Sequence, residues 1–268
     1  MTISRKIAIL VLSAIFAAAL GANVLAPNRY ETQFRDAPSA QSSRRFPLGT
    51  DDLGRDRLSR LLYGSRVSLL LAPAAALLAT ILAALTGVSA ALMGGWWERA
   101  FITATDLSLS LPWLFALITV RAMLPLDVAP WLSVAITFAM LGLLGWSAPA
   151  RVVRAAAASM RQSEFVLQAR ACGCGRFRLL LVHLIPNLKP ILFAQFLIAI
   201  PIFILSEANL GLLGLGVAEP MPSWGNSLRD LENFSELRVN PWLLAPVVLL
   251  VVAVTCLQLL VPKENSAA

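Results

Sequence analysis

The sequence is poor in the side chains that build most active sites. Its 268 residues include one histidine, three cysteines and two tyrosines, and only 14% of them are charged. The single histidine, His183, excludes a histidine-based catalytic triad and a multi-histidine metal site. No lysine follows a glycine, which excludes a phosphate-binding P-loop. We therefore expect no catalytic residue, no metal, no cofactor and no ATPase site of the chain's own.

The cysteines and the histidine are expected to be structural. Cys172, Cys174 and Cys256 are too few for a disulfide framework. The Cys172-Gly-Cys174 pair also lacks the further ligands that a metal site requires. His183 lies among leucines, which favours a packed or interfacial side chain over a proton relay.

What the sequence has in abundance is apolar side chains. It is 58% hydrophobic, with a mean hydropathy of +0.74, whereas soluble domains carry about a quarter charged residues. The net charge of +7 comes from arginines in the loops between apolar runs, without an aromatic-interleaved basic face. We therefore predict an integral membrane protein in a lipid bilayer, with no nucleic-acid partner.

Six apolar stretches are long enough, or nearly so, to cross a hydrocarbon core that requires about 20 helical residues. They are residues 7–26, 67–93, 101–120, 128–150, 190–216 and 241–261. The first is too long for a signal peptide and has no evident cleavage site, so we interpret it as a retained span. No strand-like alternation is present, which predicts an all-α integral membrane protein with six transmembrane helices.

Six spans place both termini on one side of the membrane, but the charges do not decide which side. Eleven Lys and Arg residues fall on each face. Arg5 and Lys6, next to the first span, favour a cytoplasmic N-terminus.

The two longest loops on the opposite face contain local helical patterns. Leu58, Leu61 and Leu62 recur at helical spacing, which predicts an amphipathic lead-in helix lying at the interface before the second span. Asp51, Asp52 and Gly54 are typical of a turn ahead of it, and a capped helix entry and a direct functional role both remain open. In the 218–240 loop we expect a hairpin with a short amphipathic helix. Pro73 and Pro149 are interpreted as lying in the first turns of the second span and at the end of the fourth.

Two carboxylates lie inside predicted spans and are candidate functional residues. Asp106 lies one to two turns beyond Arg99, which favours an interfacial, paired carboxylate. Glu207 lies near the far end of the fifth span, where we expect a hydrogen-bond anchor between helices. The glycines that follow it permit close helix approach or an unwound helix end; they are Gly211, Gly214 and Gly216.

The polar segment 160–187 separates the fourth and fifth spans. Ser163 is a candidate cap for a helix that begins at Glu164. Gly173 and Gly175 are expected to end that helix, and a second, apolar helix leads through Pro186 into the next span. The pattern predicts an exposed helix–break–helix segment, which suits either an ordinary interfacial loop or a contact for a soluble partner.

Three motifs in this order resemble a known family. Residues 165–187, FVLQARACGCGRFRLLLVHLIPN, resemble the cytoplasmic coupling loop of bacterial ABC-importer permeases. Residues 47–72 are similar to the segment before the second span in the dipeptide, oligopeptide and nickel importer permeases. Residues 210–228, LGLLGLGVAEPMPSWGNSL, resemble the same subfamily. The coupling motif departs from the family at two positions: Gln168 replaces its glutamate, so that glutamate's salt bridge could not form, and Arg170 replaces an alanine.

The resemblance implies the type I ABC-importer permease fold, with a cytoplasmic coupling helix between spans four and five. It implies a permease subunit for peptides or a similar small substrate in a bacterial inner membrane, with both termini cytoplasmic. The implied partners are ABC ATPase subunits, a second homologous permease and an extracytoplasmic substrate-binding protein. The expected parts are 1–26 (tail and first span), 27–66 (extracytoplasmic loop), 67–261 (permease core) and 262–268 (cytoplasmic tail).

The resemblance also assigns roles to residues. Contact with the ATPase is implied for Glu164, Phe165, Gln168, Ala169, Arg170, Gly173 and Pro186. Structural or pathway roles are expected for Asp106, Glu207, Gly214, Gly216 and Trp224. The motif before the second span consists of Gly49, Thr50, Asp51, Gly54, Arg55 and Asp56.

Other functions are less well supported by the residues. A permease for nickel or another metal chelate stays open, because no His/Met-rich site distinguishes it. A membrane-embedded enzyme is disfavoured by the lack of paired catalytic groups. A proton-driven secondary transporter is disfavoured because the second, fourth and sixth spans carry no charge.

Overall fold

The computed structural model describes residues 3–123, 128–161, 163–232, 237–238 and 240–261. These residues are almost entirely helical and contain only two isolated β-bridges, Gln33 with Arg55 and Thr50 with Asp56. Within these described ranges, five helical segments are long and apolar enough to cross a membrane, and a bent pair of helices makes a sixth candidate. The predicted all-α, multi-span fold is confirmed.

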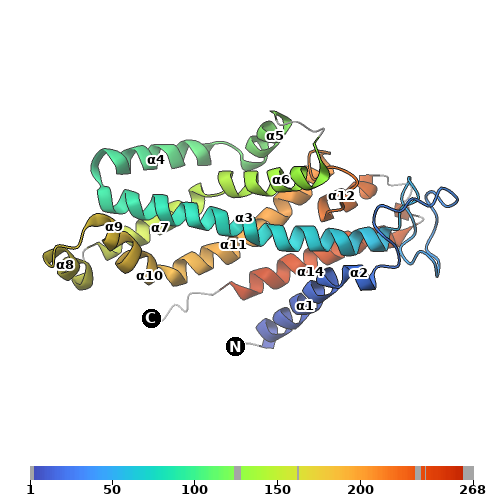
Figure 1. Cartoon of the computed structure of the whole chain (residues 1–268), viewed down its shortest axis with the longest axis horizontal. Coiled ribbons are helices and arrows are strands. Elements are labelled where there is room, and N and C mark those ends of the chain that lie inside the picture. Colours follow the sequence, from blue (N-terminus) through green and yellow to red (C-terminus); the bar gives the residue numbers. More distant parts are fainter. Residues whose placement is uncertain (1–2, 124–127, 162, 233–236, 239, 262–268) are drawn as a thin grey trace.

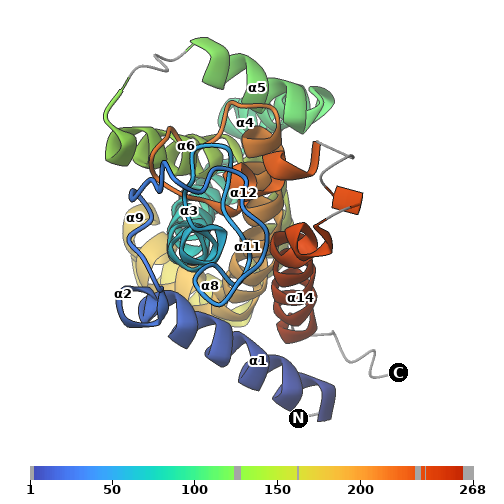
Figure 2. The ribbon, with the colours of Figure 1, turned by 90° about the vertical axis from the view of Figure 1, so that its right-hand side faces the viewer.

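The five long segments form one elongated bundle (Figure 1). They are α1 (Ile3–Leu20), α3 (Arg57–Met93), α6 with α7 (Pro130–Leu144, Ser147–Met160), α11 (Lys189–Leu212), and η3 with α14 (Pro241–Leu244, Ala245–Leu260). Seen along the bundle in Figure 2, α3 lies centrally, with α1 below it and α6 above it. The beginning of α1 and the end of α14 meet, because the Arg5 guanidinium donates to the Leu260 carbonyl.

The predicted third span is bent rather than straight. It consists of α4 (Gly95–Ser110) and α5 (Trp113–Met123), whose axes differ by 88°. The break falls at Leu111, whose backbone is extended, with φ −80° and ψ 132°. Leu111 precedes Pro112, and a residue before proline is driven out of the helical region by steric contact with the ring.

The predicted second span begins earlier than expected. Helix α3 has 37 residues, and the Asp56 side chain caps its first turn by accepting from the Leu58 N–H. The lead-in segment is therefore the start of α3, not a separate helix lying at the interface, and it buries Ser59 and Leu61. Pro73 consequently lies inside the helix rather than in its first turns.

The fourth span also continues past its predicted end. Helix α7 runs to Met160, and Pro149 is its third residue instead of closing the span. Proline is tolerated there because the first N–H groups of a helix have no intrahelical partner.

Small residues allow the helices to pack closely. A Cβ added to Gly87 of α3 would lie 2.6 Å from the Ala150 carbonyl oxygen of α7. A Cβ on Gly142 of α6 would lie 2.9 Å from the Ala75 carbonyl oxygen of α3. Close backbone approach of this kind is typical of helix packing in membranes.

The two ends of the bundle differ in structure (Figure 1). One end carries α8 (Glu164–Ala171), α9 (Arg176–Arg178), the π-helix η1 (Leu179–Leu184) and α10 (Ile185–Asn187). The other end carries the loop that precedes α3, the short helix α2 (Ala22–Leu25), α12 (Trp224–Leu228) and η2 (Arg229–Glu232). We call these the α8 end and the α12 end.

Candidate functional site

The helix–break–helix segment at the α8 end follows from its local sequence. The Ser163 carbonyl accepts from the N–H groups of Val166 and Leu167, and its hydroxyl donates to the Met160 carbonyl rather than capping α8. Gly173 has φ +76°, a conformation that other residues rarely adopt, and the next N–H, of Cys174, bonds to the Ala169 carbonyl 3.0 Å away. Helix α8 therefore ends before Gly173.

This segment is fixed to the bundle by one buried side and exposes the other. Val166, Leu179 and Leu184 pack with Val88 of α3 and Val153 of α7 in one buried cluster. The other side exposes large apolar side chains. The exposed fraction is 37% for Phe165, 53% for Leu167 and 76% for Phe177.

The structure places the predicted ATPase-contact residues on this segment. Glu164 and Gln168 are exposed on α8, Ala169 is half-buried there, and the backbone of Arg170 belongs to the same helix. Pro186 is half-buried in α10, which follows α9 and η1 after α8.

Sequence reasoning missed the π-helix that follows. The Ile185 N–H bonds to the Leu180 carbonyl, five residues back, instead of the usual four. The next residue, Pro186, has no N–H to donate, so a regular α-helix loses a hydrogen bond at this point. Pro186 was the signal in the sequence, although a proline alone does not predict a wider turn.

At the α12 end, the motif before α3 forms a compact turn. Gly49 and Gly54 have φ values of +70° and +74°, and a Cβ on Gly54 would lie only 2.2 Å from the Phe34 carbonyl oxygen. The Thr50 hydroxyl accepts from the Ala40 N–H at 2.8 Å and donates to the Ala37 carbonyl. The turn positions the charged residues that follow it.

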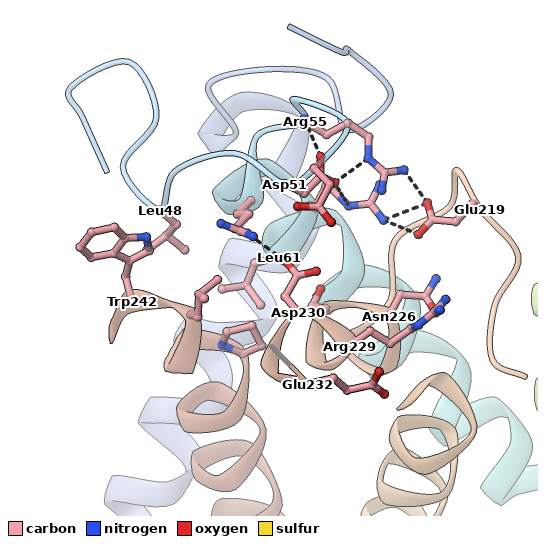
Figure 3. A pocket seen from close by; sticks show the side chains of 16 residues that line it. Leu48, Asp51, Arg55, Leu61, Glu219, Asn226, Arg229, Asp230, Glu232 and Trp242 are labelled. Atoms are coloured by element: carbon pink, nitrogen blue, oxygen red, sulfur yellow. Dashed lines mark hydrogen bonds and ion pairs between the residues drawn. The ribbon is translucent and has the colours of Figure 1, made fainter. Parts of the chain in front are cut away.

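Those residues join the two loops at the α12 end through a network of ion pairs (Figure 3). Arg55 Nε lies 2.7 Å from Asp51 Oδ2, and Arg55 Nη1 lies 2.7 Å from Glu219 Oε2. Arg60 Nη2 lies 2.9 Å from Glu219 Oε1. Burial alone lowers the pKa of Arg55, but hydrogen bonds and charges from Asp51 and Glu219 outweigh it and raise that pKa.

A cavity of about 510 Å³ lies beside this network (Figure 3). Arg57 Nε binds Asp230 Oδ2 at 3.0 Å in its wall. Burial raises the pKa of Asp230 above its ordinary value, and the Arg57 guanidinium offsets part of that effect. Both arginine and carboxylate side chains therefore line this cavity.

Glu207 lies inside the bundle. It is fully buried on α11, and the Ser68 hydroxyl of α3 donates to its Oε2 at 3.2 Å. Trp224 of α12 is also fully buried and donates its ring N–H to Ser65 Oγ at 2.8 Å. A Cβ on Gly225 would lie 2.8 Å from Glu207 Oε1, so only glycine fits there. Glu207 and Trp224 therefore meet where α3, α11 and α12 converge.

The two remaining predicted glycines have separate surroundings. Gly214 has φ +75°, and its surroundings are open apart from Arg229. Gly216 packs on α11, because a Cβ there would lie 2.7 Å from the Gly211 Cα. Its carbonyl accepts from Arg121, which is 1% exposed although its local sequence does not indicate a buried position.

Asp106 has a different partner from the one its spacing suggested. Its carboxylate binds Arg151 of α7, with Oδ1 and Nη1 2.7 Å apart, rather than Arg99 on its own helix. The side chains of Asp106 and Arg151 are 54% and 50% exposed. A second pair, Glu98 with Arg154 at 2.6 Å, joins α4 to α7 closer to the α8 end. The expected pairing of Asp106 is therefore present, but its partner lies on the neighbouring helix rather than on α4.

Comparisons with known proteins agree on one kind of molecule. Residues 79–262 match the family model described as the binding-protein-dependent transport system inner membrane component. A protein of Brucella suis biovar 1 that is named as a peptide permease is 34% identical over 195 residues, which are 73% of this chain and 63% of that protein.

Two further relatives carry the name oligopeptide transport system permease protein OppC. The Escherichia coli K12 protein is 31% identical over 221 residues, 82% of this chain and 70% of its own length. The Bacillus subtilis protein is 31% identical over 195 residues, 73% of this chain and 61% of its own length. The chain thus matches less than two thirds of the length of the Brucella and Bacillus relatives.

Proposed function

Because this chain belongs to the family of binding-protein-dependent transport system inner membrane components, with the type I importer permease fold, we propose that it is the permease subunit of an ATP-driven peptide importer. In this proposal it forms half of the translocation pathway beside a second, homologous permease. Separate ATPase subunits supply the energy, and an extracytoplasmic binding protein delivers the substrate.

The exposed ion pair between Asp106 and Arg151 is the observation that carries the pathway role. Both side chains are about half exposed, on helices that belong to candidate membrane spans. Charged groups in such spans are costly in lipid and almost always face a bundle interior or a water-filled cavity. The face formed by α4 and α7 therefore suits a polar pathway or a second subunit far better than lipid.

The α8 end suits contact with an ATPase. Helix α8 exposes Phe165 and Leu167, and its buried side packs against the ends of α3 and α7. A force applied to α8 would therefore reach two membrane-spanning helices directly. In this proposal α8 is the coupling helix, the α8 end is cytoplasmic, and the two loops at the α12 end receive the binding protein.

Peptides are the substrate class that the relatives favour. The Brucella protein is named as a peptide permease and the Escherichia coli and Bacillus proteins as oligopeptide permeases. Peptides are zwitterions, and the cavity at the α12 end presents both arginines and carboxylates.

Co-purification tests the assembly. A tagged copy of the full chain, expressed with its neighbouring genes, should bring down an ATPase and a second permease. The membrane fraction of a strain that lacks the tag serves as the control. Recovery of the tagged chain without any ATPase would remove the main support for the proposal.

A single substitution tests the coupling role. Gly173→Pro replaces a residue at φ +76° with one fixed near −65°, so we expect the end of α8 to be disrupted and peptide uptake to be lost while the chain still inserts. Gly175→Ala is the matched control, because a Cβ at Gly175 meets nothing within 4 Å, and uptake should persist. Normal uptake by Gly173→Pro would rule out α8 as the coupling helix.

A further inference from the structure

A second cavity at the α12 end, of about 480 Å³, lies on the outside of α3. Its wall is formed by the segment after α2, by the first half of α3, and by Met221 and Pro222 of the loop before α12. We call it the interfacial cavity. Its lining includes two arginines, Arg29 and Arg66, and two tyrosines, Tyr30 and Tyr63.

The interfacial cavity lies at the level where α3 would leave the hydrocarbon. Arg66 lines it, and the next charged residue along the chain is Glu98. The rings of Tyr30 and Tyr63 lie 5.0 Å apart between centroids, in the same wall. Tyrosines and arginines at the end of an apolar run are typical of the headgroup region of a bilayer.

The charges of this cavity are not balanced. Of the described residues that line it, Glu31 is the only one with a carboxylate. Among the described residues, no ion pair is formed by Arg29 or Arg66, whereas Arg55 and Arg60 at the same end are both paired with Glu219. Two free guanidinium groups against one carboxylate favour an anionic ligand, and guanidinium groups bind phosphate well.

The part of the lining that follows Arg66 along α3 is apolar. Val67, Leu70 and Leu71 follow Arg66 on α3, and Leu70 is 42% exposed. A ligand whose anionic group lies between the arginines would therefore place its remainder along these side chains. That combination, one anion above an apolar chain, matches a phospholipid and not a free anion.

We propose that the interfacial cavity binds an anionic phospholipid of the leaflet at the α12 end. Its phosphate lies between Arg29 and Arg66, and an acyl chain follows Val67 and Leu70. The proposal requires only that α3 crosses the bilayer, so it stands independently of the transported substrate and of the ATPase.

Native mass spectrometry of the purified full chain in detergent tests this site. With added phosphatidylglycerol or phosphatidylcholine of equal chain length, we expect the chain to retain the anionic lipid preferentially. Arg29→Gln or Arg66→Gln should weaken phosphatidylglycerol binding about fivefold each, and the double variant about thirtyfold. Arg66→Lys keeps the charge and should restore most of the binding.

The double variant Arg35→Gln, Arg44→Gln is the matched control. It removes the same charge from two exposed residues of the same loop that do not line the cavity, and lipid binding should not change. Equal melting temperatures of the two double variants without lipid would show that both are folded.

Three results would overturn the proposal. The first is equal retention of phosphatidylcholine and phosphatidylglycerol by the wild-type chain. The second is displacement of phosphatidylglycerol by millimolar inorganic phosphate, which would indicate a site for a free anion. The third is a photocrosslinker on Leu70→Cys that reacts in membranes with a second protein chain instead of lipid.

Discussion

At the scale of the residue, Glu207 illustrates what a buried carboxylate does in an apolar bundle. It is fully buried, and the Ser68 hydroxyl donates a hydrogen bond to its Oε2. Burying a carboxylate costs free energy unless hydrogen bonds compensate, so the contact with Ser68 offsets part of that cost.

The hydrogen bond between Glu207 and Ser68 gives the first prediction. Glu207→Ala leaves the buried Ser68 hydroxyl without its acceptor, so we expect the free energy of unfolding to fall by about 1–3 kcal/mol. Glu207→Gln retains a side-chain carbonyl that can accept the same hydrogen bond and should cost less. Thermal unfolding of the purified full chain measures both. If Gln were as damaging as Ala, the hydrogen bond would not be the reason.

Asp230 gives a pH dependence with a defined sign. Burial raises its pKa in the folded chain above 3.8, its ordinary value. The folded state therefore binds a proton more readily than the unfolded state. As pH rises from about 4 through the pKa of the folded state, the stabilising contribution of the protonated Asp230 is lost. In Asp230→Asn this contribution is absent. The melting temperature of the wild type relative to Asp230→Asn should fall between pH 4 and pH 7, and a rise would contradict the assignment.

Some of these residues could be identified from the sequence and others could not. A carboxylate in an apolar run, as at Glu207, stands out because its surroundings are apolar along the chain. The ion-pair partner of Asp106 cannot be identified from the sequence in this way, because it depends on which helix lies alongside α4. The buried Arg121 side chain donates hydrogen bonds to the carbonyls of Leu215 and Gly216, which are more than 90 residues away in the chain. No local sequence pattern predicts such a distant contact.

At the scale of the element, the contact between α11 and α12 depends on glycine. A Cβ on Gly211 would lie 2.4 Å from the backbone C and Cα atoms of Gly225, which cannot move as a flexible side chain would. Helix α12 lies on α11 and α3 only because both sides of this contact lack side chains.

Gly211→Ala should therefore displace α12. We expect a loss of about 1–3 kcal/mol in the free energy of unfolding, as for other overpacked sites. The matched control is Gly175→Ala, which meets open space and should melt like the wild type. Thermal unfolding of both variants, followed by fluorescence-detected size exclusion, measures the difference. A wild-type melting temperature for Gly211→Ala would mean that the backbones are not in close contact.

Helix existence was easier to predict than helix bounds. Apolar runs long enough to cross a bilayer predict helices because, apart from closed β-barrels, only a helix pairs all its backbone N–H and C=O groups in lipid. The bounds depend on weaker local effects. Asp56 caps α3 eleven residues before the apolar run begins, and Pro112 bends a run that hydropathy alone makes continuous.

At the scale of the whole molecule, a membrane would separate the α8 end of the bundle from the α12 end. Cys172 is exposed at the α8 end, and Gln41 is exposed in the loop at the α12 end. In the proposed orientation the first faces the cytoplasm and the second faces outward.

Cysteine labelling tests that orientation. A variant that retains only Cys172 should react with a membrane-impermeant maleimide in inverted vesicles but not in spheroplasts. A cysteine-free variant with Gln41→Cys should show the opposite pattern. Reaction of both sites from the same side would contradict a bundle that crosses the membrane with these two ends apart.

The length of α3 has a mechanical consequence. Its 37 residues form one helix of about 55 Å, with its first turns among the loops of the α12 end and its last turns packed against the segment that carries α8. A helix acts as a lever when it tilts as a unit, and a tilt of about 10° about one end would carry the other end through about 10 Å. A small tilt of α3 about its α8 end would therefore displace its α12 end by about the length of a side chain.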